Sequence, residues 1–289
     1  MKKLLAMAVT AAFTVSMLAG CGQSAETTDA SAQETETEAA DEETAGTADA
    51  ASEDTAERTT FTVGFDAEFP PYGYMDESGE YTGFDLELAQ EVCDRNGWEL
   101  VKQPIDWDSK DMELSSGAID CIWNGFTMNG REDAYTFSVP YVDNSQVFVV
   151  AADSGITVFD DLAGKNVGVQ KDSSALAALE GDAAELAATF GSLTQYSDYN
   201  TAFMDLEQGA IDALAIDVGV ADYQIASRGE GFVKLSENLA SEQYGIGFKL
   251  GNVELKDQVE KTLLEMADDG TFGKIAEKYG LSDSVCLGK

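Results

Sequence analysis

The chain has 289 residues, of which 54 are Asp or Glu and 17 are Lys or Arg, and its formal net charge is −37 at pH 7. This charge argues against nucleic acid as a partner, because binding phosphates needs a basic patch. The absence of histidine excludes a Ser-His or Cys-His nucleophile and argues against zinc, so we expect neither a metal nor a cofactor. The acidity favours solubility outside the cell, or a mild preference for cationic solutes.

The first twenty residues have the pattern of a secretory signal. Two lysines follow Met1, an apolar run extends from Leu4 to Leu18, and small residues precede Cys21. A charged start, an apolar middle and a small-residue cleavage site are typical of a signal that is removed. We predict a signal peptide at residues 1–20. The alternative is a short transmembrane anchor, but spanning a bilayer needs about 20 apolar residues and this run is shorter.

An acidic segment follows the signal. Residues 22–57 contain 12 Asp or Glu and no Lys or Arg, and low hydrophobicity with charge of one sign keeps such a segment disordered. A cysteine at the cleavage site resembles the lipobox of bacterial lipoproteins, which implies a lipid on Cys21. We therefore predict a lipidated Cys21 and a tether at residues 21–58, which place the protein outside the cytoplasm and anchored to the cell membrane.

The three other cysteines are Cys93, Cys121 and Cys286. An odd count cannot be fully paired within one chain, so at most one disulfide forms. Cys93 falls in an amphipathic helical pattern and Cys121 in a strand, which favours buried, small apolar side chains over a metal site.

From Thr59 onward the composition is globular over 231 residues, a length that fits two lobes. Strand and helix patterns alternate, which implies a parallel sheet. We predict strands at 61–65, 98–103, 145–151, 166–170, 193–196, 211–216 and 244–250. We predict helices at 85–95, 108–115, 199–208, 253–268 and 271–279, a short helix within 156–164, and a long alanine-rich helix from about 172 to 190.

One nine-residue pattern occurs twice. Met112–Asp120 returns as Met204–Asp212, 92 residues later and with the same spacing. Each copy has the pattern of a helix end, a glycine suited to a left-handed C-cap, and a strand. The repeat predicts two similar α/β lobes, joined by extended crossovers near Val150 and Gly245.

The segments after the two repeated strands differ. The first strand leads into a donor-rich loop with Asn124, Thr127 and Arg131, and the second leads to a single carboxylate, Asp217. A small zwitterion needs both kinds of partner, because its carboxylate and its ammonium group lose hydration on burial. The loop 66–74, rich in aromatic residues, follows the first strand at the sheet edge where ligands bind in open α/β folds.

Several motifs together resemble the bacterial extracellular solute-binding proteins of polar amino-acid ABC transporters, over about residues 59–281. They are Gly64-Phe65-Asp66 with Phe69, Gly83-Phe84-Asp85-Leu86, Gly117-Ala118-Ile119-Asp120, Phe137-Ser138 with Pro140-Tyr141, Asp161–Lys165 with Val167-Gly168-Val169, and Asp268–Thr271. The resemblance implies an α/β fold with two similar Rossmann-like lobes joined by a two-strand hinge, a clamp like that of type II periplasmic binding proteins. It places lobe 1 at 59–150 and 245–289 and lobe 2 at 151–244.

The family's binding residues carry over by position to Asp66, Phe69, Trp107, Thr127, Arg131, Ser173, Ser174 and Asp217, and Asn124 lies in the same donor-rich loop. The loop between Thr127 and Arg131 is about one residue shorter than is usual for the family. Counting back from Phe137-Ser138 assigns Arg131 to the family's arginine. Its alternative role is an ion pair with Glu132 or Asp133.

Each of these residues has a chemical role open to it. The Arg131 guanidinium can hold a carboxylate through two hydrogen bonds, and Asp217 can bind an ammonium group from the opposite lobe, so that the ligand ties the lobes together. Ser174 begins a helix, whose free N–H groups suit the same carboxylate or an ordinary cap.

The remaining residues would shape the walls of the site. Phe69, Trp107 and Trp123 are either apolar walls or core residues. Asp66 either accepts a hydrogen bond from the ligand side chain or forms an Asx-turn.

The resemblance implies a receptor with no catalytic residue that captures a free amino acid and delivers it to the permease subunits of an ABC transporter, and we expect it to be a monomer. The alternatives are an enzyme resembling cyclohexadienyl dehydratases, in which Asp66 and Glu68 would do acid–base chemistry, and a sensor that signals to a membrane partner.

Overall fold

The computed structural model describes residues 58–288. These residues all belong to one of the two units into which the chain divides, Asp54–Lys289. The predicted signal peptide, the lipidation site at Cys21 and the tether up to residue 57 lie outside the described residues. None of the described helices is both long enough and apolar enough to cross a membrane.

The first lobe is built on a five-stranded sheet with the order β5-β1-β6-β14-β7. Its strands are β1 (Thr60–Phe65), β5 (Glu99–Pro104), β6 (Cys121–Ile122), β7 (Tyr135–Phe137) and β14 (Gly247–Lys249). β1 is parallel to β5 and β6, whereas β14 is antiparallel to β6 and β7. Its helices are α1 (Phe84–Asn96), η1 (Trp107–Ser109), α2 (Lys110–Ser116), α7 (Val253–Asp268) and α8 (Thr271–Lys278). A small sheet of β2 (Glu68–Phe69), β3 (Gly73–Met75) and β4 (Tyr81–Thr82) follows β1.

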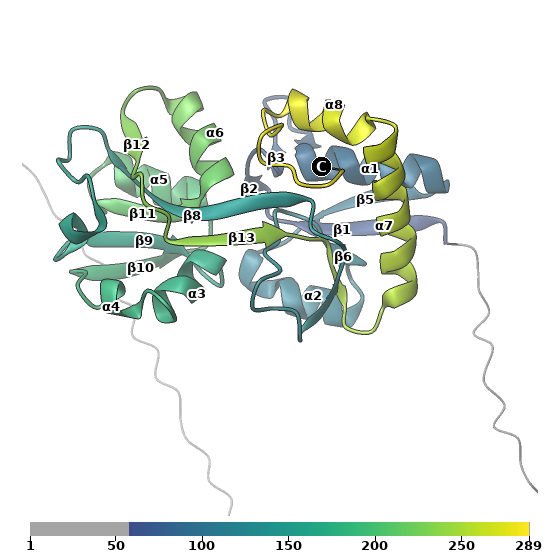
Figure 1. Cartoon of the computed structure of the whole chain (residues 1–289), viewed down its shortest axis with the longest axis horizontal. Helices are drawn as coiled ribbons and strands as arrows, with labels where there is room; N and C mark the ends of the chain where they lie inside the picture. The colour runs from purple at the N-terminus through teal and green to yellow at the C-terminus, as the bar shows by residue number, and fades with distance from the viewer. Residues whose placement is uncertain (1–57, 289) are drawn as a thin grey trace, which may run out of the picture. The chain divides into compact units, whose positions relative to one another are not determined.

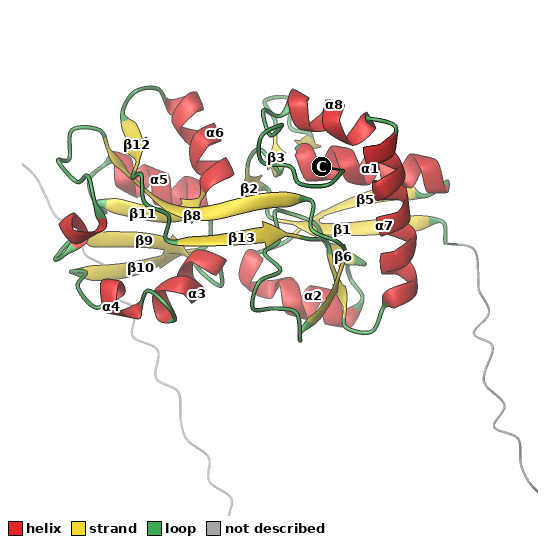
Figure 2. Ribbon diagram, in the orientation of Figure 1, coloured by secondary structure: helices red, strands yellow, loops and turns green. Residues whose placement is uncertain are grey.

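The second lobe is built on a sheet with the order β10-β9-β11-β8-β12, to which β13 is added alongside β8. Its strands are β8 (Val142–Ala151), β9 (Asn166–Gln170), β10 (Ser192–Tyr196), β11 (Ala213–Asp217), β12 (Phe232–Lys234) and β13 (Ala240–Tyr244). Its helices are η2 (Phe159–Leu162), α3 (Ser174–Glu180), α4 (Ala184–Ala187), α5 (Tyr199–Glu207) and α6 (Val218–Arg228). Figure 2 shows helices on both sides of the strands in each lobe.

Two antiparallel strands connect the lobes. β8 and β13 pair from Val142 opposite Tyr244 to Gln146 opposite Ala240, and Figure 1 shows them side by side between the two sheets. β8 pairs with strands of the second sheet from Val142 to Ala151, and Val142 also forms an isolated bridge with Val285 near the C-terminus.

The repeated pattern makes the same structure in both lobes. Asp120 accepts the N–H of Thr62 at 2.7 Å through Oδ2, and Asp212 accepts the N–H of Asn166 at 2.8 Å in the same way. In each copy the preceding glycine has a left-handed backbone, with φ 80° at Gly117 and the equivalent conformation in the second copy. The repeated aspartates therefore connect neighbouring strands in the sheet of each lobe.

One expectation about helices was wrong, and one helix was not expected. The alanine-rich helix expected to run to residue 190 is interrupted, because α3 ends at Glu180 and the chain turns at Gly181 before the short α4. Glycine in a helix interior costs about 1 kcal/mol relative to alanine, which offsets the alanine preference there. A whole helix, α6, was not expected, because its first residues, Val218 to Ala221, continue the apolar run of β11.

Candidate functional site

Asp217 lies at the point where β11 ends and α6 begins. It is 4% exposed, and its Oδ1 accepts hydrogen bonds from Gln146 Nε2 at 2.6 Å, Asn144 Nδ2 at 2.9 Å and the Tyr244 hydroxyl at 2.5 Å. Burial, followed by the charge of Glu242, raises the pKa of Asp217 to about 7. The three hydrogen bonds favour the anionic form of this carboxyl group, and a cation nearby would favour it further.

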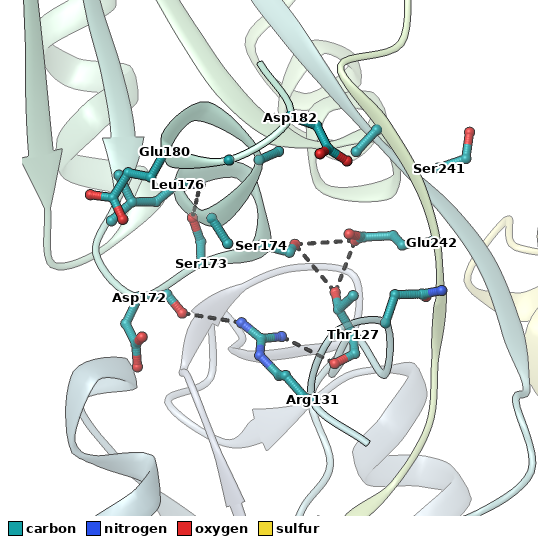
Figure 3. A pocket seen from close by; sticks show the side chains of 16 residues that line it. Thr127, Arg131, Asp172, Ser173, Ser174, Leu176, Glu180, Asp182, Ser241 and Glu242 are labelled. Atoms are coloured by element: carbon teal, nitrogen blue, oxygen red, sulfur yellow. Dashed lines mark hydrogen bonds between the residues drawn. The ribbon is translucent and has the colours of Figure 1, made fainter. Parts of the chain in front are cut away.

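Glu242 is a site residue that the sequence analysis missed. Its Oε1 accepts hydrogen bonds from the hydroxyls of Thr127 at 2.9 Å and Ser174 at 3.2 Å (Figure 3). The same oxygen accepts from Asn144 Nδ2 at 2.7 Å and Gln146 Nε2 at 2.8 Å. The sequence carries no clear signal for Glu242, because β13 is polar; only the structure shows that residues 242 and 244 are buried and their neighbours are not.

Arg131 points into the same region from the first lobe. Its guanidinium donates to the backbone carbonyl oxygen of Thr127 at 3.1 Å and to that of Asp172 at 3.4 Å, and it stacks over the Phe126 ring at 5.0 Å. Within residues 58–288 it forms no ion pair, so the alternative pairing with Glu132 or Asp133 does not occur there. Its charge is held in place by carbonyl groups and is left without an anionic partner in the described chain.

A cavity of about 560 Å³ lies beside these groups. Its lining includes Thr127 and Arg131 from the first lobe and Ser173, Ser174 and Glu242 from the second lobe and its hinge strand (Figure 3). The Ser173 hydroxyl accepts the N–H of Leu176 at 3.1 Å, which makes it an ordinary cap of α3. A cationic side chain from the first lobe and acidic side chains from the second lobe therefore surround one cavity.

Asp66 makes a second contact between the lobes. Its Oδ2 accepts from Gln170 Nε2 at 2.7 Å, and its Oδ1 accepts the N–H of Glu68 at 2.8 Å, as in an Asx-turn. Burial raises its pKa to about 6. It lines a cavity of about 410 Å³ in which Glu68, Asp106, Glu113 and Asp198 are the other acidic residues.

The remaining predicted site residues are aromatic side chains and Asn124, and all of them are buried. Trp107 lines the acidic cavity and also packs edge-on against Phe126 at 5.7 Å between ring centroids, so it is both wall and core. Phe69 packs against Tyr199 of the second lobe at 5.9 Å. Asn124 is 1% exposed, and neither its amide oxygen nor its amide nitrogen has a hydrogen-bond partner within the described residues. Trp123 is fully buried against Tyr141 and lies in the core.

The structure thus divides the predicted residues into groups. Thr127, Arg131, Ser173 and Ser174 surround the larger cavity, whereas Asp66 and Trp107 line the acidic one. Asp217 lies behind the larger cavity and is connected to it through the amide groups that it shares with Glu242. In residues 58–288 no three His, Cys, Asp or Glu side chains are arranged to hold a metal ion.

Comparisons with known proteins agree on a family. Residues 61–282 match the model of the bacterial extracellular solute-binding proteins, family 3. The L-cystine-binding protein TcyJ of Escherichia coli (strain K12) is 30% identical over 226 residues, which cover 77% of this chain and 83% of that protein. The arginine-binding extracellular protein ArtP of Bacillus subtilis (strain 168) is 30% identical over 221 residues, which cover 75% of this chain and 84% of that protein.

A solved structure gives the same result. It is a substrate-binding protein of an ABC uptake transporter from Streptococcus pneumoniae with bound histidine. Its TM-score is 0.75 and its identity 34%, over 78% of this chain and 94% of that one.

Proposed function

The chain belongs to the bacterial extracellular solute-binding proteins of family 3, and from this we propose that it captures one free amino acid between its two lobes and delivers it to the permease of an ABC transporter. The observation that supports this most directly is the cavity lined from both lobes by Arg131 and Glu242. A zwitterion needs partners of both signs when it is desolvated. Ligand contacts from both lobes would favour the closed clamp.

We propose that the ligand's carboxylate meets Arg131, where a planar guanidinium can donate two hydrogen bonds. The ammonium group would then meet Asp217. The acidic cavity around Asp66 supports a ligand with a polar or cationic side chain, since a carboxylate side chain would be repelled there. The relatives described above bind cystine, arginine and histidine, which are ligands of this kind.

We propose that the protein has no catalytic residue. The dehydratase alternative depends on Asp66 and Glu68 acting as a pair, but Asp66 is hydrogen-bonded to Gln170 and Glu68 to Asn200 of the second lobe. Both carboxyl groups therefore contribute to contacts between the lobes. The lobes themselves are proposed to divide the chain at residues 59–150 with 245–289, and 151–244.

Anchoring at the membrane is also a proposal. A lipid on Cys21 and the acidic tether would hold a monomeric clamp at the outer face of the cytoplasmic membrane. Replacing Cys21 with Ala and fractionating cells tests this, because the variant should leave the membrane fraction. A variant that stays membrane-bound would contradict lipidation at Cys21.

The ligand screen is the experiment that decides the proposed function. The purified chain is heated with each of the twenty amino acids, cystine or arogenate, and each ligand that raises the melting temperature is then titrated by calorimetry. One or a few amino acids should bind with saturable heat and remain chemically unchanged. Conversion of arogenate would favour the enzyme, and binding of none of these compounds would contradict the proposal.

A further inference from the structure

Two buried carboxylates meet at the hinge, and they share the same donors. Gln146 Nε2 lies 2.6 Å from Asp217 Oδ1 and 2.8 Å from Glu242 Oε1. Asn144 Nδ2 lies 2.9 Å and 2.7 Å from the same two oxygens. Two oxygens within hydrogen-bond distance of one nitrogen are close enough to be bridged by one ammonium group.

We propose that Glu242 is a ligand-binding residue, and that with Asp217 it forms a paired-carboxylate site for the ammonium group of the ligand. This inference rests on the proposed function and deepens it by assigning a second anionic partner to the ligand's amine. The site takes a primary ammonium group, which carries three N–H donors and no acceptor.

Two amide oxygens near the carboxylates have no hydrogen-bond donor within the described residues, which favours a ligand that brings a donor. Asn144 Oδ1 and Gln146 Oε1 are both buried, and neither has a hydrogen-bond partner within the described residues. The side chain of Gln146 is fully buried and that of Asn144 is 6% exposed. Leaving a buried acceptor without a donor is unfavourable, so the surroundings of the carboxylate pair have acceptors in excess. An ammonium group is the part of an amino acid that corrects this imbalance.

Electrostatics distinguishes ammonium binding by Glu242 from an alternative role for the same residue. Because the Thr127 and Ser174 hydroxyls donate to Glu242, Glu242 could instead be an internal substitute for the ligand's carboxylate, displaced on binding. In that case the incoming carboxylate would face Asp217 as closely as Glu242 does, and the repulsion that helps to raise the Asp217 pKa would persist. An ammonium group between the two carboxylates removes the repulsion. The hydroxyls then hold Glu242 in position, and Arg131 is left for the ligand's carboxylate.

The pair also predicts a proton change on binding. A cation between the carboxylates lowers the pKa of Asp217, so binding near pH 6 should release a proton. The other titratable groups around the pair are Tyr72, Tyr199 and Tyr244, and burial raises the pKa of each hydroxyl, so they stay neutral in this range. The charged residues of the adjoining cavity, besides Glu242 itself, are Arg131, Asp172, Glu180 and Asp182.

The test compares Glu242→Gln with Glu230→Gln, which makes the same charge change at an exposed position of the second lobe. L-arginine, L-cystine and L-histidine are the probes, titrated at pH 6 in buffers of different ionisation heat. Glu242→Gln should weaken binding roughly 10- to 100-fold, as expected for one lost charge-assisted bond, and should release fewer protons than the wild type. Glu230→Gln should behave as the wild type does. Unchanged or tighter binding by Glu242→Gln overturns the inference and favours the displaced-carboxylate role.

A measurement on the unliganded protein tests the paired site independently of the proposed function. Replacing Glu242 with Gln removes a negative charge next to Asp217, so the Asp217 pKa of the unliganded protein should fall when followed by carboxyl-carbon NMR. The melting temperature at pH 7 should not decrease. If the wild type binds no amino acid, the proposed function fails. An unshifted Asp217 pKa, or a melting temperature lower by more than about 5 °C, overturns the paired site on its own.

Discussion

Lys110 at the start of α2 forms an ion pair with Asp172, and this pair joins the first lobe to the second. The Lys110 side chain is 2% exposed, and its ammonium group also lies over the Trp107 ring at 5.2 Å. Asp172 accepts a further hydrogen bond from Arg131 through its backbone oxygen. One residue of the second lobe is thus bound by two cationic side chains of the first, which favours the arrangement of the lobes in this structure.

Replacing Asp172 with Asn should therefore weaken ligand binding. The change leaves the Lys110 charge in the closed form without its carboxylate, at a cost of about 1–2 kcal/mol, or roughly tenfold in Kd. Calorimetry with the ligand found in the screen measures this. Asp153→Asn, at an exposed position of the second lobe, is the control. Equal affinities for Asp172→Asn and the wild type would show that the ion pair does not favour closure.

Asp217→Asn and Arg131→Gln are each expected to abolish measurable binding. Each change leaves one charge of the ligand desolvated without its partner, which costs about 2–5 kcal/mol, or roughly 30-fold to several thousand-fold in affinity. Both unliganded variants should melt close to the wild-type temperature. A variant that binds normally, or one that unfolds without ligand, would show that the replaced residue is structural.

Asp66→Asn tests the charge of the ligand side chain. Removing this carboxylate from the acidic cavity should lower the affinity for L-arginine more than the affinity for a neutral amino acid such as L-glutamine. The ratio of the two dissociation constants in the variant and the wild type is the measurement. Tight binding of L-glutamate that is insensitive to Asp66→Asn would contradict the preference for a polar or cationic ligand.

Buried carboxyl groups should make the protein less stable as the pH rises from about 4 to 7. Asp85 is completely buried, and burial raises its pKa from 3.8 to about 7, while Asp66 and Asp217 are shifted in the same direction. The folded state then binds more protons than the unfolded state in this window, so the free energy of unfolding decreases with rising pH. Asp85 alone contributes up to about 4 kcal/mol of this change.

Urea unfolding at pH 5 and pH 7 measures the effect. The wild type should be more stable at pH 5, and Asp85→Asn should reduce the difference because Asn does not titrate. Exposed carboxylates whose pKa is lowered in the folded state, such as Asp161, make the free energy of unfolding increase with rising pH. They do so only below about pH 4. A wild type that gains stability between pH 5 and 7 would contradict the prediction.

Gly64 and Ile119 pack too closely for a larger residue on β1. A Cβ at Gly64 would lie 2.4 Å from Ile119 Cδ1, so Gly64→Ala should destabilise the protein by about 1–3 kcal/mol. Ile119→Val removes that methyl group, and the double variant should be more stable than the sum of the single effects by about 1 kcal/mol. Urea unfolding at fixed pH provides the four free energies. Strict additivity would contradict a direct contact.

Gly168 and Ile211 make the same contact in the second lobe, where a Cβ at the glycine would lie 2.6 Å from the isoleucine Cδ1. The sequence showed half of this relationship. The Gly-Ala-Ile-Asp motif contains Ile119 in its first copy and Ile211 in its second. This repeated motif can be read directly from the sequence, and it predicted two similar lobes. The glycines opposite them are distant in sequence, and only the paired strands bring them together.

The positions of predicted residues in the fold could be inferred where strands have clear apolar patterns. Asp217 ends β11 and Asp66 follows β1, so their place at the carboxyl ends of strands could be inferred. Glu242 could not, because β13 has the polar sequence ASEQY and its inward face is set by pairing with β8 across 98 residues, from Asn144 to Glu242.

The sequence also could not show what each predicted residue contacts. Arg131 was expected to meet a ligand carboxylate or Glu132 or Asp133, and it donates to carbonyl oxygens of both lobes. Ser174 was expected to offer backbone N–H groups, and its hydroxyl meets Glu242. Such contacts depend on side-chain positions from separate elements, which local propensity does not encode.

The position of β14 in the first sheet has a consequence for the order in which the molecule can form. β14 completes the first sheet between β6 and β7, yet it is synthesised after every strand of the second sheet. During synthesis from the N-terminus, the second lobe can therefore close its sheet while the first still lacks a central strand and exposes the edges of β6 and β7. Such non-local pairing is slow and leaves unpaired strand edges open to aggregation. The first lobe is therefore the part of this molecule that most needs protection until the C-terminal segment from β14 onward has been synthesised.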